Sequence, residues 1–237
     1  MIEIAYPSHA SGEPRPMKAA VIHAIAAGLR SQLFRGSARR IEVAELARRA
    51  ARMRLNGRDV RVIWDLAHKV HDNKGTPVLG ICEHDPQEPR AIMISLDVTL
   101  ADEPELFRST AAHELGHAVF DMPAAIGAGA RQTFRTRRDL CRAAAPIDWS
   151  EWRADEFMGA FLVPAYPLSK SFTRCASAAS LRLRWSGKGK VPVPAISAAE
   201  ASGDAIDSLT DMLAEEFGVS PGFMAVRLQK YGHISAS

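Results

Sequence analysis

One stretch of the sequence, TAAHELGHAV at residues 110–119, restricts the possible folds of this chain more than any other. Apolar residues surround it on nearly every side, and Glu114 is the only acidic or basic residue, histidines aside, between Arg108 and Asp121. A helix that is apolar all round is stable only where other elements of a domain cover all of its faces. We therefore predict a helix over about 102–120 at the centre of a hydrophobic core.

Two details of this segment concern how the helix begins and how it packs. Asp102 and Glu105 have the spacing of a capping box, and Pro104 is compatible with a first helical turn. Gly116 lies in the helix interior, where glycine costs about 1 kcal/mol relative to alanine. We expect a close approach by neighbouring backbone at Gly116 to account for it.

The two histidines of this segment have the spacing of metal ligands. His113 and His117 are four residues apart, so a helix places both rings on one face, where their nitrogens can reach a single ion. Glu114 then lies about 100° further round the axis, where a carboxylate can act as a base beside the ion. Two histidines satisfied within a core are the alternative, but burying three polar groups without partners is costly. The spacing therefore favours a metal site with Glu114 as its catalytic residue.

A tetrahedral catalytic metal needs a third protein ligand. The residues after His117 read AVFDMP, so a third histidine at the metzincin spacing is absent. Glu151 is the best candidate, because EWRAD places it and Asp155 on one face of a second predicted helix. Asp155 could then accept a hydrogen bond from the second ring nitrogen of a ligating histidine. Glu151 could instead be the carboxylate of a capping box that begins at Asp148.

Periodicity and turn residues predict the elements that precede the HELGH helix. Apolar residues near a 3.6-residue period predict helices over 41–55 and 59–72, with an Asn-Gly stop between them. Short apolar runs bounded by turn residues predict strands at 77–82 and 91–96, which could pair with each other.

The segments at the two ends and after the HELGH helix have their own signatures. Residues 1–16 contain three prolines and are predicted to be a poorly ordered lead, and 123–146 to be a mobile loop. A helix from about Ser150 should end at Pro164. The last stretch predicts two short helices around Gly218-Val219, the second capped by Ser220.

These elements predict an α+β fold with a short sheet, a central helix and a C-terminal helical element. The predicted regions are an N-terminal lead and helix (1–40), the core domain (41–165), a basic connector (166–203) and a C-terminal helical element (204–237). The connector contains six lysines and arginines, and no acidic residue occurs from Phe157 to Ala199. It is either a solvated loop or a surface for an acidic partner or nucleic acid.

Composition excludes few functions but indicates the compartment. The net charge of +3 decides little, whereas three cysteines without CxxC spacing argue against a disulfide framework. A reducing compartment, and by default the cytoplasm, is therefore expected. The apolar stretch at 17–29 is too short to span a membrane and is read as a helix, so no membrane association is predicted.

The HELGH segment, followed some thirty residues later by EWRADEFMGAFLVP, resembles the ImmA/IrrE family of metallopeptidases. The family pattern is His-Glu-x-x-His and then Glu-x-x-Ala-Asn-x-Phe-Ala-x-x-Leu-Leu-Met-Pro. Five residues match the second motif in register, namely Glu151, Ala154, Phe157, Leu162 and Pro164, and its departures include Asp155 for Asn, Met158 for Ala and Val163 for Met. The tail LAEEFGVSPGFMAVRLQKYG is similar to the closing helix-turn-helix-like element of the family, so the resemblance covers about residues 41–232.

The resemblance implies a zincin-like, thermolysin-like domain and a zinc-dependent endopeptidase. His113, His117 and Glu151 would be the zinc ligands and Glu114 the base, with Mn2+ as a possible replacement for Zn2+. Family members are known for cleaving, or helping to inactivate, helix-turn-helix repressors, and some resemble components of toxin–antitoxin pairs. The implied partner is therefore a helix-turn-helix repressor or an antitoxin-like protein.

The oxyanion formed in peptide hydrolysis needs a further hydrogen-bond donor. Tyr166 is the candidate chosen from the sequence, and His68, His71 and His84 are others. A structural role is an alternative for each of them.

A regulator that binds a repressor or DNA, with a structural metal site, is the alternative from another functional class. Its support is the helical tail and the basic connector. In the tail, however, Arg227 and Lys230 are balanced by Glu215 and Glu216, which makes a poor phosphate-binding surface. Direct DNA binding is therefore not expected, and the sequence does not indicate an oligomeric state.

Overall fold

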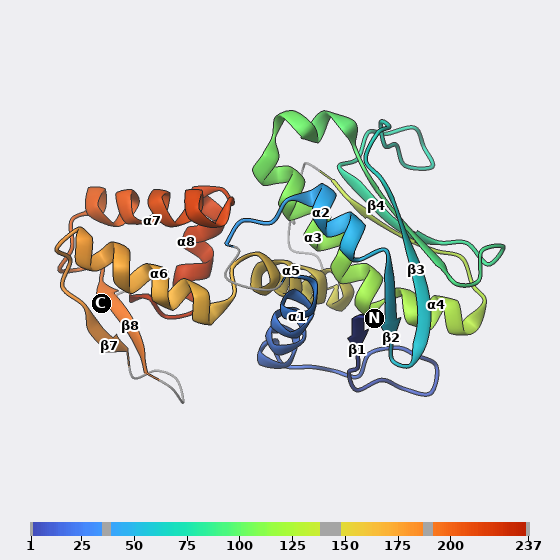
Figure 1. The fold of residues 1–237 in the computed structure, drawn as a ribbon, viewed down its shortest axis with the longest axis horizontal. Helices are drawn as coiled ribbons and strands as arrows, with labels where there is room; N and C mark the ends of the chain where they lie inside the picture. Colours follow the sequence, from blue (N-terminus) through green and yellow to red (C-terminus); the bar gives the residue numbers. More distant parts are fainter. Residues whose placement is uncertain (1, 35–38, 138–147, 187–191, 236–237) are drawn as a thin grey trace. The chain divides into compact units, whose positions relative to one another are not determined.

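The structure is a computed structural model that describes residues 2–34, 39–137, 148–186 and 192–235 (Figure 1). The chain is mixed α and β, and it divides into two compact units. The first unit comprises Met1–Gly36 and Ile41–Phe161, and the second comprises Ser37–Arg40 and Leu162–Ser237. The boundary after Phe161 lies near the end of the predicted core domain at residue 165. The HELGH segment belongs to the first unit.

A six-stranded mixed sheet forms the framework of the first unit. Its order is β1 (Ile2–Ile4), β2 (Arg52–Leu55), β3 (Arg58–Asp65), β5 (Ala91–Leu96), β4 (Gly80–His84) and β6 (Gln132–Thr136). The β1–β2 and β3–β5 pairs are parallel and the others antiparallel. The predicted pairing of two strands near 77–82 and 91–96 is confirmed as β4 and β5, although β4 begins only at Gly80.

Helices cover one face of this sheet. On β5, Ile92, Ile94 and Leu96 are fully buried, whereas Met93 between them is 38% exposed. This alternation of buried and exposed side chains is expected for a strand with one face covered by other elements and one face open to solvent. The HELGH helix α3 (Pro104–Phe120) packs against β4, β5 and β6, and α4 (Met122–Ala128) against β4. The sheet therefore forms the floor beneath the HELGH helix.

The predicted central helix is confirmed, and so is its close contact at Gly116. From Thr110 to Phe120 every residue of α3 is buried. A Cβ atom at Gly116 would lie 3.0 Å from Cα of Ala154 on α5 (Trp149–Leu162), so only glycine allows the two helices this approach. The predicted capping box is wrong, because Asp102 ends a short 3-10 helix and Glu103 is the N-cap residue.

The predictions of helices over 41–55 and 59–72 are wrong except for a short segment. The helix α2 is limited to Val43–Arg49, and β2 and β3 follow it. Asn56 and Gly57 have φ values of 46° and 79°, so the Asn-Gly pair makes a hairpin turn between strands and does not stop a helix. Val60 and Val62 are buried on alternate positions of β3, which is strand periodicity.

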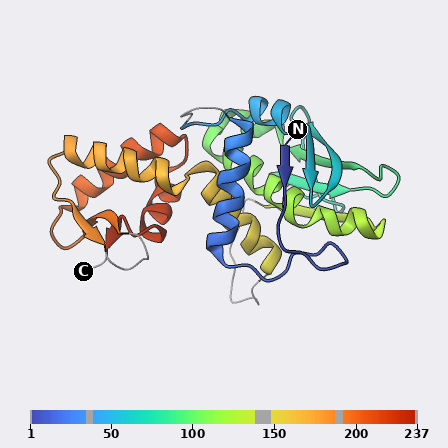
Figure 2. The ribbon, with the colours of Figure 1, turned by 60° about the horizontal axis from the view of Figure 1, so that its bottom comes forward.

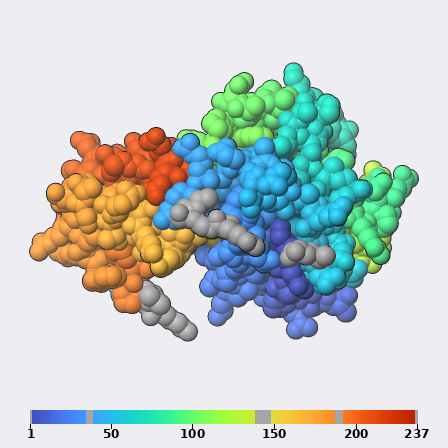
Figure 3. All heavy atoms as spheres, in the orientation of Figure 1, coloured from blue at the N-terminus to red at the C-terminus, as the bar shows by residue number. Residues whose placement is uncertain are grey.

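The N-terminal segment is also more ordered than predicted. It begins with β1, which pairs with β2, and Tyr6 is buried with its hydroxyl donating to the Val119 carbonyl at 2.7 Å. Figure 2 shows β1 beside β2 and the loop that leads on to α1 (Ala19–Leu33). In the space-filling view, the blue N-terminal residues and the cyan strands after them form a continuous surface (Figure 3). Three prolines therefore mark a fixed irregular segment and not a loose lead.

The predicted loop at 123–146 contains two elements in its described part, namely α4 and the edge strand β6. Gly129, with φ 59°, ends α4 in the left-handed conformation and lets the chain turn into β6. The rest of this prediction, residues 138–147, lies outside the described residues.

The second unit has its own small sheet and three helices among its described residues. Its elements are α6 (Ala165–Ala178), β7 (Arg184–Ser186), β8 (Val193–Ser197), α7 (Gly203–Phe217), α8 (Pro221–Lys230) and β9 (Ile234–Ser235). The prediction of a connector at 166–203 is therefore wrong. The two C-terminal helices are confirmed: Gly218 is left-handed, and the Ser220 side chain accepts from the Phe223 amide at 3.2 Å. In the described part of the chain, no helix is long and apolar enough to cross a membrane.

Candidate metal centre

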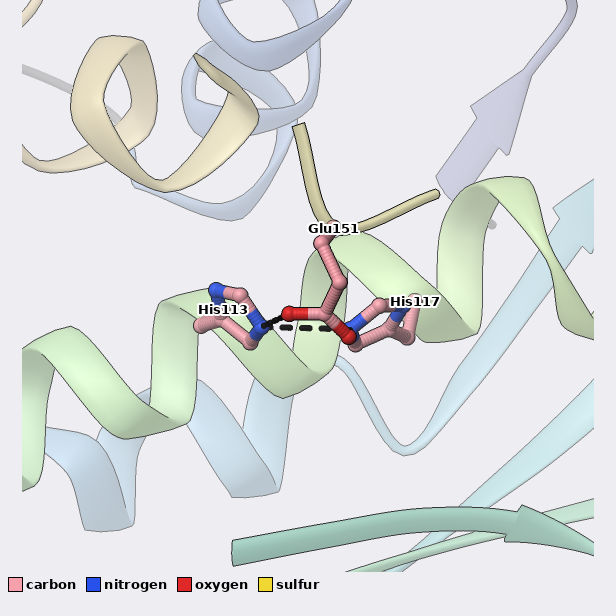
Figure 4. A group of neighbouring side chains, drawn as sticks. All are labelled: His113, His117 and Glu151. Atoms are coloured by element: carbon pink, nitrogen blue, oxygen red, sulfur yellow. Dashed lines mark hydrogen bonds and ion pairs between the residues drawn. The ribbon is translucent and has the colours of Figure 1, made fainter. Parts of the chain in front are cut away.

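Three side chains converge on one point between α3 and α5, in the first unit (Figure 4). The Nε2 atoms of His113 and His117 are 3.1 Å apart. Each also faces the Glu151 carboxylate, with Nε2–Oε distances of 3.5 Å for His113 and 3.3 Å for His117. Among the described residues this is the one group of three or more such side chains compact enough to hold an ion.

The spacing of these donor atoms fits a bound cation. Two ligand atoms about 2.0–2.1 Å from one tetrahedral zinc ion are roughly 3.3–3.4 Å apart. The distance between the two Nε2 atoms, 3.1 Å, and the two distances from these nitrogens to the Glu151 oxygens, 3.3 and 3.5 Å, lie around this value. Two imidazoles and a carboxylate are also a common ligand set of catalytic zinc. The residues present therefore fit a divalent metal ion of this type.

The start of α5 explains how Glu151 reaches the site. The Asp148 carboxylate accepts hydrogen bonds from the amides of Ser150 at 2.9 Å and Glu151 at 3.4 Å, as an N-cap residue does. This cap fixes the first turn of α5, and the contact of Ala154, in the next turn, with Gly116 sets the helix against α3. The carboxylate of Glu151 consequently lies against both histidine rings.

The second nitrogen of each histidine has a carboxylate partner. His113 Nδ1 lies 3.1 Å from Asp155 Oδ1, and His117 Nδ1 lies 2.9 Å from Asp121 Oδ2. Such partners fix the orientation of a ligating ring. The sequence predicts Asp155 for this position. Asp121 is not among the residues predicted from the sequence, although it follows His117 at helical spacing.

The surroundings of His117 contain two more residues that the sequence did not reveal. Arg153 Nη2 donates to Asp121 Oδ1 at 2.5 Å, and the Phe134 ring stacks on His117 with centroids 4.2 Å apart. Both come from elements distant in sequence, so only the folded chain brings them to the site. They hold the His117 ring and its carboxylate partner in place.

Glu114 is completely buried beside the histidines. Its Oε1 accepts a hydrogen bond from Thr136 Oγ1 at 2.7 Å, whereas its Oε2 has no hydrogen-bond partner among the described residues. A Cβ atom at Gly80 would lie 2.9 Å from Oε1, so glycine on β4 leaves room for this carboxylate. Burial raises the pKa of Glu114 above its ordinary value. The carboxylate thus keeps one oxygen that can take up a proton.

The pKa shifts of His113 and Glu151 in the metal-free cluster indicate that the cluster favours a positive charge at its centre. Burial acts to lower the pKa of His113, but hydrogen bonds to Asp155 and Glu151 outweigh it and raise the pKa to about 10. Burial acts to raise the pKa of Glu151, but hydrogen bonds from His113 and His117 bring it far below its ordinary value. Without a metal ion, protons on the rings therefore supply the positive charge.

The surroundings of three of the candidate oxyanion donors are described by the structure. Tyr166 lies on α6 in the second unit, where the residue is 70% exposed and the Lys170 ammonium is 4.6 Å from the ring centroid. His68 pairs with Asp65 at 2.9 Å, and His84 donates through Nδ1 to the Ala91 carbonyl. A role for Tyr166 in catalysis stays a prediction.

Comparisons with protein-family models, with curated proteins and with solved structures found no match for this chain. A function must therefore be argued from the geometry of the site and from the motifs of the sequence.

Proposed function

We propose that this protein is a zinc-dependent endopeptidase that hydrolyses a peptide bond in a protein substrate. One observation carries the proposal: His113, His117 and Glu151 converge at ligand spacing, and Glu114, on the same helix as both histidines, has a buried oxygen without a partner among the described residues. Mn2+ is a possible alternative to Zn2+, because both accept nitrogen and carboxylate ligands.

The roles of the residues follow from their positions. His113, His117 and Glu151 would hold the ion, and Asp155 and Asp121 would orient the two histidines. A zinc ion bound in this way supplies Lewis acidity and lowers the pKa of water from 15.7 to about 7. Glu114 accepts the proton as the water oxygen attacks the peptide carbon. It then returns the proton to the amine nitrogen as the C–N bond breaks.

The edge of the sheet beside the site supports a polypeptide substrate. The strand β6 ends the sheet order, and it carries Phe134 against His117 and Thr136 against Glu114. An extended peptide can bind to such an edge as an added strand. Its backbone would then pass directly beside the histidines, which favours hydrolysis within a chain over hydrolysis of a small molecule.

A helix-turn-helix repressor or an antitoxin-like protein is the proposed substrate, on the strength of the sequence motifs. The second unit supports a role in protein contacts more than in DNA binding. The exposed positions of α7 include Asp204, Asp207 and Asp211, whereas Arg227 on α8 is only 2% exposed. Phosphate binding requires exposed cations, so this pair of helices is poorly suited to DNA.

The variant Glu114→Gln tests the proposal, because glutamine keeps the size of the side chain but cannot accept the proton. We expect zinc content and melting temperature close to the wild type, and at least ~10²-fold slower cleavage of a proteome-derived peptide library, measured by mass spectrometry. The matched control is Glu105→Gln, an exposed position on the same helix, which should cleave normally.

Two results would contradict this proposal. Normal cleavage by zinc-loaded Glu114→Gln would remove the catalytic role of Glu114. A zinc-loaded wild type that cleaves neither the peptide library nor a helix-turn-helix protein encoded beside it would favour the regulator with a structural metal.

A further inference from the structure

A cavity of about 490 Å³ begins beside His117 in the first unit. Asp121, which bonds to the His117 ring, and Phe134, which stacks on it, both line this cavity. Its volume is in the range of about 300–1,000 Å³ that is usual for ligand-binding pockets. A group bound there would therefore lie one side chain away from the proposed metal ligands.

The sequence leaves this space open by placing small residues around it. Gly12, with φ 92°, brings the N-terminal loop so close to α4 that a Cβ atom would lie 3.1 Å from Cα of Ala124. The loop thus forms one wall of the cavity, and alanines of α4 and of the turn after it form another: Ala124, Ala125, Ala128 and Ala130. The alanine wall is apolar, which suits the aliphatic part of a side chain.

Among the described residues, the charged ones that line the cavity are Glu13, Asp121 and Arg153. Both oxygens of Asp121 are engaged, one by His117 and one by Arg153. Glu13 differs, because its backbone is fixed by hydrogen bonds with His9 and Ser11 while its carboxylate makes no hydrogen bond or ion pair within the described part of the chain. Two carboxylates against one guanidinium leave the cavity with an excess of negative charge.

We propose that this cavity receives a lysine or arginine side chain of the substrate next to the bond that is cleaved, and that Glu13 binds its charged end. This inference rests on the proposed peptidase function and names a residue that determines its specificity. The aliphatic part of the side chain packs on the alanines, as long basic side chains do on apolar surfaces. An acidic side chain is disfavoured, because it would meet Glu13 while Arg153 is already paired with Asp121.

The first experiment compares cleavage profiles of the zinc-loaded full chain on a proteome-derived peptide library. The wild type should prefer lysine or arginine at one position beside the cleaved bond. Glu13→Gln should reduce that preference about 3–5-fold, the effect of a partly exposed ion pair. Glu13→Lys should change it toward aspartate or glutamate, and Ala128→Leu should reduce it by filling the cavity. The control Glu88→Gln removes an exposed carboxylate elsewhere in the same unit and should keep the wild-type profile.

A second experiment does not depend on peptidase activity. N-acetyl-arginine amide and its uncharged isostere, N-acetyl-citrulline amide, are titrated into the full chain without added metal and followed by NMR. The arginine compound should bind about 3–5-fold more tightly, and Glu13→Gln should remove the difference. Equal binding of the two compounds, or no binding of either, would overturn the assignment of the cavity. Cleavage without a basic preference would also overturn it and leave the peptidase proposal intact, whereas arginine binding without any cleavage would contradict only the peptidase proposal.

Discussion

The two halves of the candidate metal centre are supported in different ways. At the end of α3, the His117 side chain is completely buried, stacks on Phe134 and bonds to Asp121, which in turn is held by Arg153. One turn earlier, His113 bonds to Asp155, whose side chain is 37% exposed. The carboxylate partner of His117 comes from the same stretch of chain, and the partner of His113 from another helix.

This difference indicates which half is preformed. Asp121 lies four residues after His117, so the bond between them stays within one stretch of chain, and α5 acts on this bond less directly, through the ion pair of Arg153 with Asp121. The orientation of His113 and the position of Glu151 depend directly on the packing of α5 against α3. We therefore expect changes in helix packing to disturb His117 less than His113. Loss of the carboxylate partner should in turn destabilise the His113 half less than the His117 half.

Loss of either histidine should have the largest effect. His113→Ala and His117→Ala each remove a ligand, so zinc measured by elemental analysis should fall from near one per chain to almost none. His117→Ala should also lower the melting temperature of the metal-free chain more, because it leaves a cavity in a fully buried region. The control is His84→Gln, which replaces a buried histidine bonded to a carbonyl and should retain zinc. A stoichiometric zinc content in either alanine variant would remove that histidine from the ligand set.

The carboxylate partners should give the next largest effect, and they separate the two halves directly. Asp121→Asn and Asp155→Asn should each weaken zinc affinity by roughly 10–100-fold, measured in competition with a chelator. Asp121→Asn should in addition reduce the free energy of unfolding by roughly 3–5 kcal/mol, because it leaves the largely buried Arg153 without its opposite charge. Asp155→Asn should cost little stability. Equal stability losses in urea denaturation would show that the two halves are not supported differently.

The sequence predicted correctly those elements whose own residues favour the structure that they adopt in the fold. The helices α3 and α5 and the C-terminal pair were predicted because each is an uninterrupted run of residues suited to a helix. Pro164 limits α5, and Ser220 caps α8. The ligand candidates could be found for the same reason, since i to i+4 spacing on a helix fixes which side chains share a face. Asp121 could have been found by this rule, because it follows His117 by four residues.

Elements that depend on distant partners were mispredicted. The segment ELARRAARMRL is rich in helix-forming residues, yet its second part becomes β2 because β1 and β3 pair with it on either side. Tertiary pairing overrides helix propensity in such a segment. Gly80, Thr136 and Arg153 could not be found from the sequence either, since each acts through a contact between elements.

The packing of α5 should produce a smaller effect that falls mainly on the His113 half. In Gly116→Ala, the new Cβ atom would lie 3.0 Å from Ala154 Cα, so the helices must separate slightly. We expect a loss of about 1–3 kcal/mol in the free energy of unfolding, together with weaker zinc binding as Glu151 and Asp155 move away. The matched control is Gly28→Ala in α1, where nothing lies within 4 Å of the new atom and about 0.5–1 kcal/mol of stabilisation is expected. Unchanged zinc affinity in Gly116→Ala would show that Glu151 does not depend on this contact.

The smallest effect concerns His233, a buried histidine of the second unit that has no carboxylate partner within the part of the chain that the structure describes. His233 is 1% exposed and donates through Nδ1 to the Pro194 carbonyl at 2.7 Å. Burial lowers its pKa, which is the opposite direction from His113, because a carbonyl offers much less to a charged ring than two carboxylates do.

A lowered pKa in the folded state means that the unfolded chain binds the proton more readily. The contribution of His233 to stability is therefore fully present above the ordinary histidine pKa of about 6.5 and is lost as the pH falls below it. His233→Gln should accordingly lose less of its melting temperature than the wild type between pH 7.5 and pH 5, while His68→Gln, at an exposed position, should keep the wild-type dependence. The same pH dependence of the melting temperature in His233→Gln and the wild type would show that burial does not hold the His233 ring neutral. The opposite pKa shifts of His233 and His113 would then not be explained by their different partners.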